Sequence, residues 1–287
     1  MTLHEIPLER RTLHGHFSRD LEPILSVEPG DAIAFATLNA GWHITDDERF
    51  DPWDAELDAG HALIGPVEVR GARAGQALVV RIDEVRPGSW GVTFGHEIKL
   101  LWKYDGSAAE WVDEKGRRVA AAPFLGVLGM PPAEPGRHST IPPRSSGGNI
   151  DCKELLPGST LYLPIPFDGA WFSAGDGHGA QADGEVSGTA IECPLDRAQL
   201  TLDVVELELR SPIARVPGAW IAFGFDEDLD LAAEQAMATM LDLMERELRI
   251  ERSYALALAS IVVDLRVTQI VNGVKGVPAV LRDDAIR

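Results

Sequence analysis

Short apolar stretches separated by turn residues fill the first 225 positions, and they restrict the possible folds more than any other feature of the sequence. Residues 24 to 27 and 32 to 35 flank the turn sequence Glu-Pro-Gly-Asp. Residues 67 to 70 and 80 to 83 alternate apolar and polar side chains, which is the period of a strand with one buried face. The pattern predicts a mainly β chain with a β-sandwich or barrel-like core.

Helical spacing replaces this pattern late in the chain, over residues 229–249 and 253–271. In the first segment one apolar stripe is expected to consist of Leu231, Met237, Met240, Leu241, Met244 and Leu248. We interpret its methionines as core residues. Since no linker or repeat is evident, we predict a single α+β domain over residues 1–287, β-rich over 1–225, with two C-terminal helices as a helical addition at 229–271.

The segment from residue 147 to residue 192 crowds polar side chains among glycines. It contains Asp151, Asp176, His178, Gln181, Asp183, Glu185 and Glu192. Two positions separate Asp176 from His178 and Asp183 from Glu185, so in extended backbone each pair points to one face. A single Asp-Gly step is an ordinary turn. An imidazole, an amide and several carboxylates together in one short segment indicate an active site.

Four runs in this segment, in their order and spacing, resemble the acetamidase/formamidase family: GGNIDCKEL, GSTLYLPI, GAWFSAGDGHGAQADGE and GTAIE. Residues 21 to 40, 60 to 91 and 254 to 277 also resemble signatures of that family, so the resemblance covers nearly the whole chain. Ala182 stands where a glycine is expected, which affects only local turn geometry. The resemblance implies hydrolysis of short linear amides such as formamide or acetamide and, together with the apolar late helices, a homo-oligomer.

Amide hydrolysis requires a polarised carbonyl group and a protonated leaving amine, and a bound divalent metal beside a carboxylate meets both needs. Asp, His and Glu are suitable zinc ligands. We predict Asp151 and His178 as metal ligands, with Asp176 as the third ligand and Glu185 as the other candidate for that place. Zinc is preferred, and calcium or magnesium is the alternative for an all-oxygen site that includes Asp183. No HExxH or Cys-x-x-Cys motif is present.

Glu185 is the predicted proton carrier, because a glutamate has a long reach and Gly184 leaves room beside it. A carrier of this kind takes a proton from the attacking water and hands it to the leaving amine. Asp183 is interpreted as its orienting partner or as a further ligand. Both assignments rest on the expectation that the two carboxylates share one extended face.

Three further positions complete the predicted site. His61 lies in a stretch that resembles the family and precedes a Gly-Pro turn, so we expect it to line the site as a catalytic residue. The acidic loop over residues 46 to 58 is a candidate lid. Asn149 and Gln181 are the candidate substrate-binding amides. His43 is interpreted as a structural or surface residue.

Other chemistries remain open at this point. The sequence has no GxSxG elbow, which disfavours a serine nucleophile. Cys152 beside Lys153 is a candidate activated thiol. A cupin-like, non-amidase metal-binding β-barrel would also carry His and carboxylates on strands, although cupins usually have several histidines in the metal site. Amidine or urea-type compounds are alternative substrates.

The acidic composition limits the partners. A formal net charge of −19 repels polyanions, so we expect no nucleic-acid and no membrane partner, and a neutral or cationic small substrate is easier to accept. The two cysteines, Cys152 and Cys193, fit a reducing compartment and are interpreted as small buried residues. No secretory h-region or membrane span is present, and we therefore predict a cytoplasmic protein.

Overall fold

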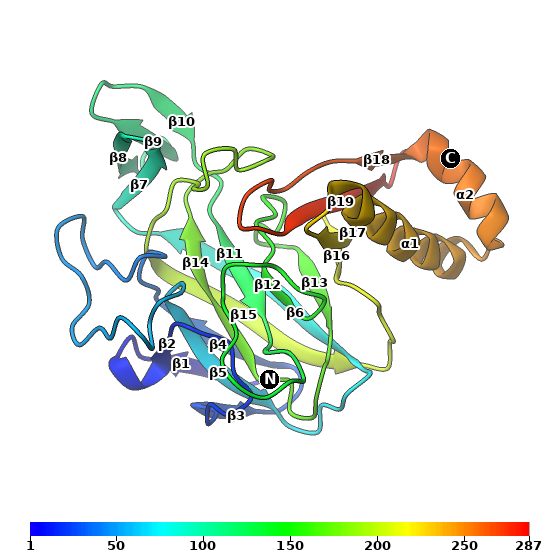
Figure 1. The fold of residues 1–287 in the computed structure, drawn as a ribbon, viewed down its shortest axis with the longest axis horizontal. Helices are drawn as coiled ribbons and strands as arrows, with labels where there is room; N and C mark the ends of the chain where they lie inside the picture. The colour runs from blue at the N-terminus through cyan, green and yellow to red at the C-terminus, as the bar shows by residue number, and fades with distance from the viewer. Residues whose placement is uncertain (287) are drawn as a thin grey trace.

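The computed structural model describes residues 1–286 and consists mainly of β-strands in three sheets (Figure 1). Nine strands form the largest sheet, in the order β1 (Leu3–Ile6), β4 (Asp31–Phe35), β15 (Leu195–Val205), β6 (Ala77–Pro87), β13 (Thr160–Pro164), β16 (Ile213–Val216), β17 (Ala219–Asp226), β19 (Lys275–Arg282) and β18 (Val263–Leu265). All neighbours in this sheet are antiparallel except β1 and β4.

The second sheet carries most of the candidate site. Its strands are, in order, β12 (Gly147–Asn149), β11 (Phe124–Gly129), β14 (Phe172–His178), β5 (Leu63–Val69) and β2 (Leu13–His14), and β3 (Leu25–Val27) pairs in parallel with β5. A short 3-10 helix, η1 (Arg10–Thr12), precedes β2. Side chains of this sheet and of the nine-stranded sheet form one continuous core, with Leu125 and Phe172 on one side and Val80 and Leu200 on the other.

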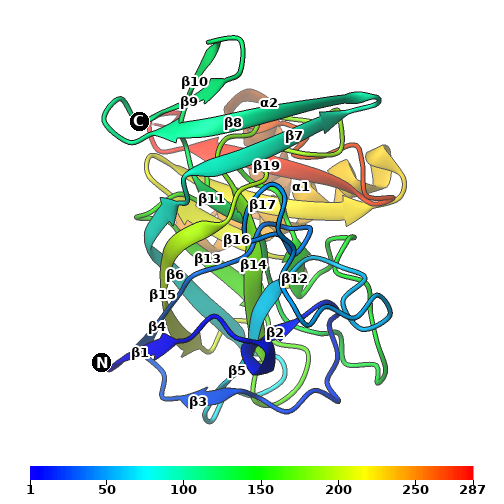
Figure 2. The same cartoon turned by 90° about the vertical axis from the view of Figure 1, so that its left-hand side faces the viewer.

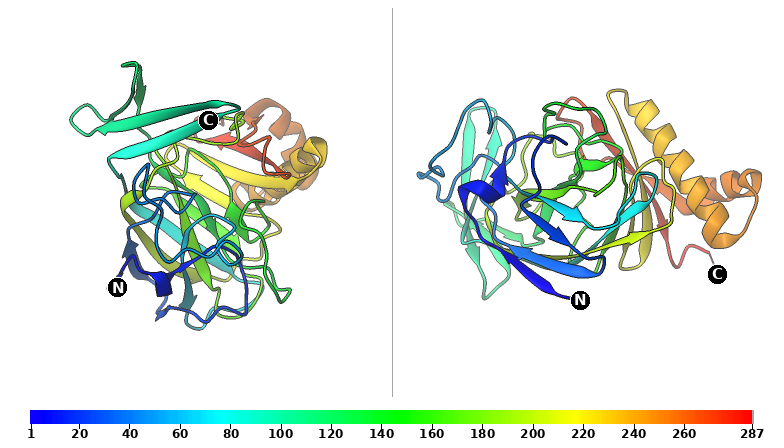
Figure 3. Two further views of the ribbon diagram at one scale, coloured as in Figure 1. Left: turned by 60° about the vertical axis from the view of Figure 1, so that its left-hand side comes forward. Right: turned by 90° about the horizontal axis from the view of Figure 1, so that it is seen from below.

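A third, four-stranded sheet projects from one end of the body (Figures 1 and 2). It contains β10 (Arg118–Ala120), β9 (Glu110–Asp113), β8 (Ile98–Asp105) and β7 (Trp90–Gly95). Figure 3 shows the two helices at the opposite end of the molecule. The predicted fold class, a mainly β core with two helices late in the chain, is confirmed. No helix within residues 1–286 is long and apolar enough to cross a lipid bilayer.

At the start of helix α1 (Leu229–Leu248), the Asp228 side chain accepts hydrogen bonds from the backbone N–H groups of Asp230 and Leu231. At its end, Arg249 has a left-handed backbone conformation. Both are common cap geometries. Small side chains bring the helix close to β17 and β19, since Ala232 and Ala236 are fully buried. The predicted stripe is therefore partly wrong: Met240, Leu241 and Met244 are buried, but Leu231 is 48% exposed.

Helix α2 (Arg252–Val262) is shorter than predicted. Residues 263 to 265 form β18, which pairs with β19, and the chain then returns toward β12, where Gln269 Nε2 donates to the backbone oxygen of Asn149. The β-branched residues Ile261, Val262 and Val263 favour a strand, and the free edge of β19 provides its partner. The predicted helical addition at 229–271 thus ends at residue 262, and strands of the main sheet follow it.

Gly224 on β17 permits the close approach of α1, and we expect Gly224→Ala to destabilise the protein. A Cβ at this position would lie 2.0 Å from the carbonyl oxygen of Ala232. The helix must move, which should lower the free energy of unfolding by about 1–3 kcal/mol. Urea denaturation measures this change. Gly95→Ala is the matched control, because no atom lies within 4 Å of its Cβ position; equal midpoints for the two variants would contradict the prediction.

Candidate functional site

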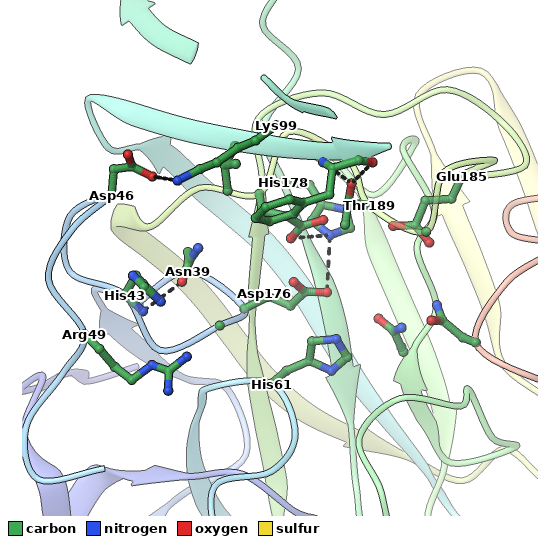
Figure 4. A pocket seen from close by; sticks show the side chains of 18 residues that line it. Asn39, His43, Asp46, Arg49, His61, Lys99, Asp176, His178, Glu185 and Thr189 are labelled. Atoms are coloured by element: carbon green, nitrogen blue, oxygen red, sulfur yellow. Dashed lines mark hydrogen bonds and ion pairs between the residues drawn. The ribbon is translucent and has the colours of Figure 1, made fainter. Parts of the chain in front are cut away.

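Ionisable side chains converge at the C-terminal end of β14, and all of them are buried. The cluster consists of Asp151, Asp176, His178, Glu185 and Glu192. His178 Nε2 lies 3.2 Å from Asp176 Oδ2 and 3.4 Å from Glu192 Oε2 (Figure 4). His178 Nδ1 lies 4.0 Å from Asp151 Oδ1. The three predicted metal ligands are thus brought together, and one potential ligand atom from each lies within 4.8 Å of the others.

Glu192 belongs to the cluster, although the sequence analysis gave it no specific role in the predicted site. One potential ligand atom each of His178, Glu185 and Glu192 also lies within 4.8 Å of the other two. A backbone bridge between His178 and Glu192 holds them side by side. The sequence did contain a hint, because Glu192 is the last residue of the family-like run GTAIE. Only the structure shows that the backbone around Glu192 pairs with that of His178 and brings the two side chains together.

Three of the acidic residues have left-handed backbone: φ is 50° at Asp151, 59° at Asp176 and 43° at Glu185. Residues other than glycine adopt this conformation at a cost of roughly 1–2 kcal/mol, and such strain gathers at functional sites. The expectation of extended backbone therefore needs correction. Asp176 and His178 do meet, but the segment around Glu185 is a turn.

Gly126 of β11 forms the floor of the cluster. A Cβ built on it would lie 2.4 Å from Asp176 Oδ2, 2.8 Å from Asp151 Oδ1 and 3.0 Å from His178 Cε1. The missing side chain therefore creates the space in which the carboxylates and the imidazole face one another. No local sequence signal marks this glycine, because it lies within an otherwise apolar strand.

The cluster carries acceptor atoms without donors. Within residues 1–286, no hydrogen-bond donor reaches either carboxylate oxygen of Asp151, or Oδ1 of Asp176, Oε2 of Glu185 and Oε2 of Glu192. Buried acceptors without partners are unfavourable, and buried charges are normally paired or bound to metals. One imidazole nitrogen among several carboxylate oxygens is a donor set that suits a divalent cation such as zinc. The residues present therefore fit a metal ion.

Burial and, after it, the charges of neighbouring groups perturb the ionisable side chains of the cluster. Burial and the charge of Glu185 raise the pKa of Asp151 well above its ordinary value. Burial raises the pKa of Glu185 to about 7, with His178 opposing and Glu192 and Asp176 adding to the rise. Burial lowers the pKa of His178, but Asp176 and Glu192 outweigh it, and the net shift is strongly upward. A bound divalent cation would relieve this repulsion among carboxylates.

Gln181 orients His178. Its Oε1 lies 2.9 Å from His178 Nδ1, and its Nε2 donates to the backbone oxygens of Asp151 (3.1 Å) and Thr268 (3.4 Å). Because an amide oxygen only accepts, Nδ1 carries the proton and the lone pair of neutral His178 is on Nε2, facing the carboxylates. Gln181 lies outside the lining of the adjacent cavity and contacts His178, so the structure places it behind the imidazole and not at the cavity wall where a substrate-binding amide was expected.

A cavity of about 330 Å³ opens beside the cluster. Asp176, His178, Glu185 and Glu192 line one part of it, and Asn39, His43 and Arg49 from the loop after β4 line another (Figure 4). The backbone N–H of His43 donates to Asn39 Oδ1 at 2.8 Å. The interpretation of His43 as a structural or surface residue is therefore incomplete, because it also faces the cavity. The sequence alone did not indicate this position, because His43 lies more than a hundred residues before β14.

His61 and Asn149 line the same cavity, and their predicted catalytic and substrate-binding roles stay predictions. The backbone N–H and Nδ1 of His61 lie 2.8 and 2.9 Å from Thr140 Oγ1. Asn149 Nδ2 donates to the backbone oxygen of Ile141 at 3.0 Å, and its Oδ1 has no donor within the described residues. Both partners belong to the proline-rich loop over residues 130 to 146, which thus positions two side chains of the site.

Asp183 lies away from the cavity and is the one predicted catalytic residue that the structure does not bring to it. Its carboxylate is half-exposed and pairs with Arg266 at 2.7 Å and Lys153 at 3.0 Å. Burial opposes these partners, but together they lower the pKa of Asp183. The turn at Gly184, whose N–H donates to the backbone oxygen of Val267, sends Asp183 outward and Glu185 inward. Asp183 therefore cannot orient Glu185.

The two cysteines are free and fully buried. Burial, followed by the charge of Glu154, raises the pKa of the Cys152 thiol well above its ordinary value. Burial also raises the pKa of Cys193. Neither residue lines the cavity, and a thiol held protonated is a poor nucleophile. The candidate thiol chemistry at Cys152 therefore has no support from its surroundings.

Comparison with known proteins agrees with this geometry. The model of the Acetamidase/Formamidase family matches residues 3–138 and 133–213. A putative formamidase of Schizosaccharomyces pombe is 28% identical, with 62% of this chain and 60% of that protein covered. The formamidase of Methylophilus methylotrophus is 27% identical, with 61% and 60% covered. The chain thus spans about 60% of the length of these curated relatives.

Solved structures share the fold along nearly the whole chain. An acetamidase from Bacillus halodurans is 28% identical with a TM-score of 0.85, and 96% of this chain and 97% of that chain are covered. An acetamidase/formamidase from Thermoanaerobacter tengcongensis, described as predicted, is 24% identical with a TM-score of 0.86, with 99% and 96% covered. The second likeness concerns the fold alone.

Proposed function

The chain belongs to the acetamidase/formamidase family, and on that premise we propose that it hydrolyses the C–N bond of linear amides to a carboxylate and ammonia. The single observation that carries the proposal is the buried cluster of an imidazole and four carboxylates at the end of β14, of which the imidazole and three carboxylates line a cavity. The family match favours this function over the cupin-like alternative. The names of the relatives, formamidase and acetamidase, support small amides as substrates.

We further propose that Asp151, Asp176 and His178 hold a divalent cation, with Glu192 next to them. Zinc is preferred because an imidazole takes part, while calcium and magnesium favour oxygen ligands alone. When bound, the cation polarises the amide carbonyl group and makes water more acidic. The unpartnered carboxylate oxygens and the space above Gly126 support a cation at this place.

Glu185 is the proposed proton carrier. It lines the cavity, its Oε2 has no donor within residues 1–286, and its pKa of about 7 suits a group that gains and loses a proton near neutral pH. It takes a proton from the attacking water and transfers it to the nitrogen of the breaking C–N bond. His61 and Asn149 border the same cavity and are proposed to orient the amide group.

Ammonia release from formamide, acetamide and propionamide by the purified, zinc-loaded protein tests this function. We expect release that a chelator abolishes and added zinc restores. No release from any of the three amides would contradict the amidase function. Release that survives complete removal of metal would contradict the metal requirement and leave the amidase function in place.

We expect Gln181→Ala to weaken metal binding, because the variant loses the acceptor that holds His178 Nδ1. Loss of such a supporting hydrogen bond typically lowers metal affinity about 10- to 100-fold. Competition with a chromophoric chelator measures the dissociation constant for zinc. Gln199→Ala, on β15 and beside Arg197, is the control. Unchanged affinity in Gln181→Ala would show that other contacts orient the imidazole.

A small amide is thus the proposed partner of the site. Homo-oligomer formation, a cytoplasmic location and the absence of nucleic-acid and membrane partners stay predictions from the sequence. We propose that a second copy covers the exposed apolar residues of α2, of which Tyr254, Leu256 and Ile261 are more than half exposed. Light scattering of the purified protein measures the number of copies.

A further inference from the structure

The cavity is much larger than formamide or acetamide requires. At roughly 30 Å³ for each water molecule in the liquid, a space of about 330 Å³ corresponds to about ten waters. Formamide and acetamide have only three and four heavy atoms. Granted the proposed amidase function, the reacting amide next to the cluster leaves most of the cavity for the rest of the substrate.

Arg49 occupies the part of the wall formed by the loop after β4, apart from the metal-binding side chains (Figure 4). A backbone bridge between His43 and Arg49 and a turn from Ile44 to Glu48 shape this loop. The guanidinium group stacks on Trp53, with 4.2 Å between its carbon atom and the ring centre. Stacking restricts the side chain and leaves its N–H groups free to bind an anion.

The charge of Arg49 has no carboxylate partner among the residues that the structure describes. Among residues 1–286, no carboxylate lies within 4.0 Å of its guanidinium group, whereas Arg10 pairs with Asp58 at 2.6 Å. Asp46, which also lines the cavity, pairs with Lys99 at 2.5 Å. An arginine that faces a substrate cavity without a carboxylate partner is a natural site for a planar anion, which it can bind through two parallel hydrogen bonds.

The net charge of −19 does not oppose an anion at this end of the cavity. Charges farther away than about 8 Å are largely screened at physiological ionic strength, so the nearby groups decide. Those nearby groups are Arg49, the Lys99–Asp46 ion pair and the imidazole of His43. The unpaired carboxylates belong to the cluster, where the proposed cation would offset them. The expectation of a neutral or cationic substrate was drawn from the overall charge and did not take these local groups into account.

We propose that the preferred substrates are monoamides of short dicarboxylic acids, whose free carboxylate binds Arg49 while the amide group lies at the cluster. Water attacks the amide carbon, the C–N bond breaks, and the products are a dicarboxylate and ammonia. Arg49 takes no part in bond breaking and acts on specificity alone. The inference rests on the proposed amidase function and adds the class of substrate.

The test compares succinamate, the monoamide of succinic acid, with butyramide, which has the same chain length and no carboxylate. We expect the wild-type protein to hydrolyse succinamate with the higher kcat/KM. In Arg49→Gln the kcat/KM for succinamate should fall about 10- to 100-fold, as expected for loss of a charge-assisted hydrogen bond. The ratio of the two kcat/KM values should fall by a similar factor, and the loss should lie mainly in KM.

Two further variants make the result decisive. Arg86→Gln, which removes an exposed arginine paired with Glu84 on β6, should leave the ratio unchanged. Arg49→Glu should lower the ratio further and favour β-alaninamide, which carries an ammonium group in place of the carboxylate. Thermal unfolding of each variant verifies that it folds.

Each outcome supports or overturns the inference. Butyramide turnover equal to or faster than succinamate turnover in the wild type overturns it, while the amidase function stands. Equal loss on both substrates in Arg49→Gln also overturns it, because the residue would then only shape the loop. No turnover of any amide, including formamide and acetamide, defeats the proposed function itself and the inference with it.

Discussion

His178→Ala should yield a folded protein that retains less than about a tenth of the wild-type metal content and releases no measurable ammonia from amides. The variant loses the only nitrogen donor of the cluster within residues 1–286 and leaves four buried carboxylates facing one another. Elemental analysis after dialysis against zinc measures the content. Zinc should raise the melting temperature of the wild type, since a ligand of the native state stabilises it, but not that of the variant.

His96→Ala is the matched control, because His96 is exposed on the four-stranded sheet's hairpin and lies outside the cavity lining. It should keep the metal and the activity. Asp151→Ala should behave like His178→Ala, since both oxygens of Asp151 face the cluster without donors. Full metal content in both variants would show that the cation, if one binds, lies elsewhere.

Glu185→Gln should lower amide turnover by about a hundredfold or more, the usual contribution of a general acid-base group, while metal content and melting temperature stay near wild type. Glutamine keeps the size of the side chain but cannot accept the proton of the attacking water. Steady-state kinetics with acetamide, together with elemental analysis, separates the two possible roles. Loss of metal would make Glu185 a ligand, and normal turnover would exclude it as the carrier.

Asp183→Asn provides the control for the same turn. Its carboxylate pairs with Arg266 and Lys153 outside the cavity, so turnover should change by no more than about twofold, as for most surface substitutions. A large loss of turnover in Asp183→Asn would restore the catalytic role that the sequence first suggested. Comparison of Asp183→Asn with Glu185→Gln thus tests whether only the carboxylate that the turn directs into the cavity is needed for turnover.

The sequence predicted secondary structure correctly where the apolar periodicity was clear. It failed where pairing with a distant strand determined whether a segment became helix or strand. Alternating segments became strands, and the stripe around Met240 became a buried helix face. Residues 263 to 265 have apolar spacing compatible with a helix, but the edge of β19 was available to them. Such pairing depends on a strand more than ten residues later in the chain, which no local pattern reveals.

The site was predictable where its residues are close in sequence. The pairing of β11 with β12 and β14 brings Asp151, Asp176 and His178 together. The types of these side chains and their proximity in sequence had already indicated them as candidate metal ligands. The cavity wall was less accessible to prediction, because His43 and Arg49 come from a loop more than a hundred residues before β14. Nothing in their neighbourhood distinguishes them from solvated surface residues.

The absence of a side chain at Gly126 has a consequence for related sequences that carry another residue at this position. Any residue with a Cβ at this position would intrude on Asp151 and Asp176, although the β11 strand could still pair with its neighbours. A gene duplicate that keeps every acidic residue but carries alanine or serine here would therefore encode a folded protein without the metal chemistry. On the proposed mechanism, the residue at this position is therefore a further criterion for activity in such copies, since the carboxylates can persist after the space between them has been lost.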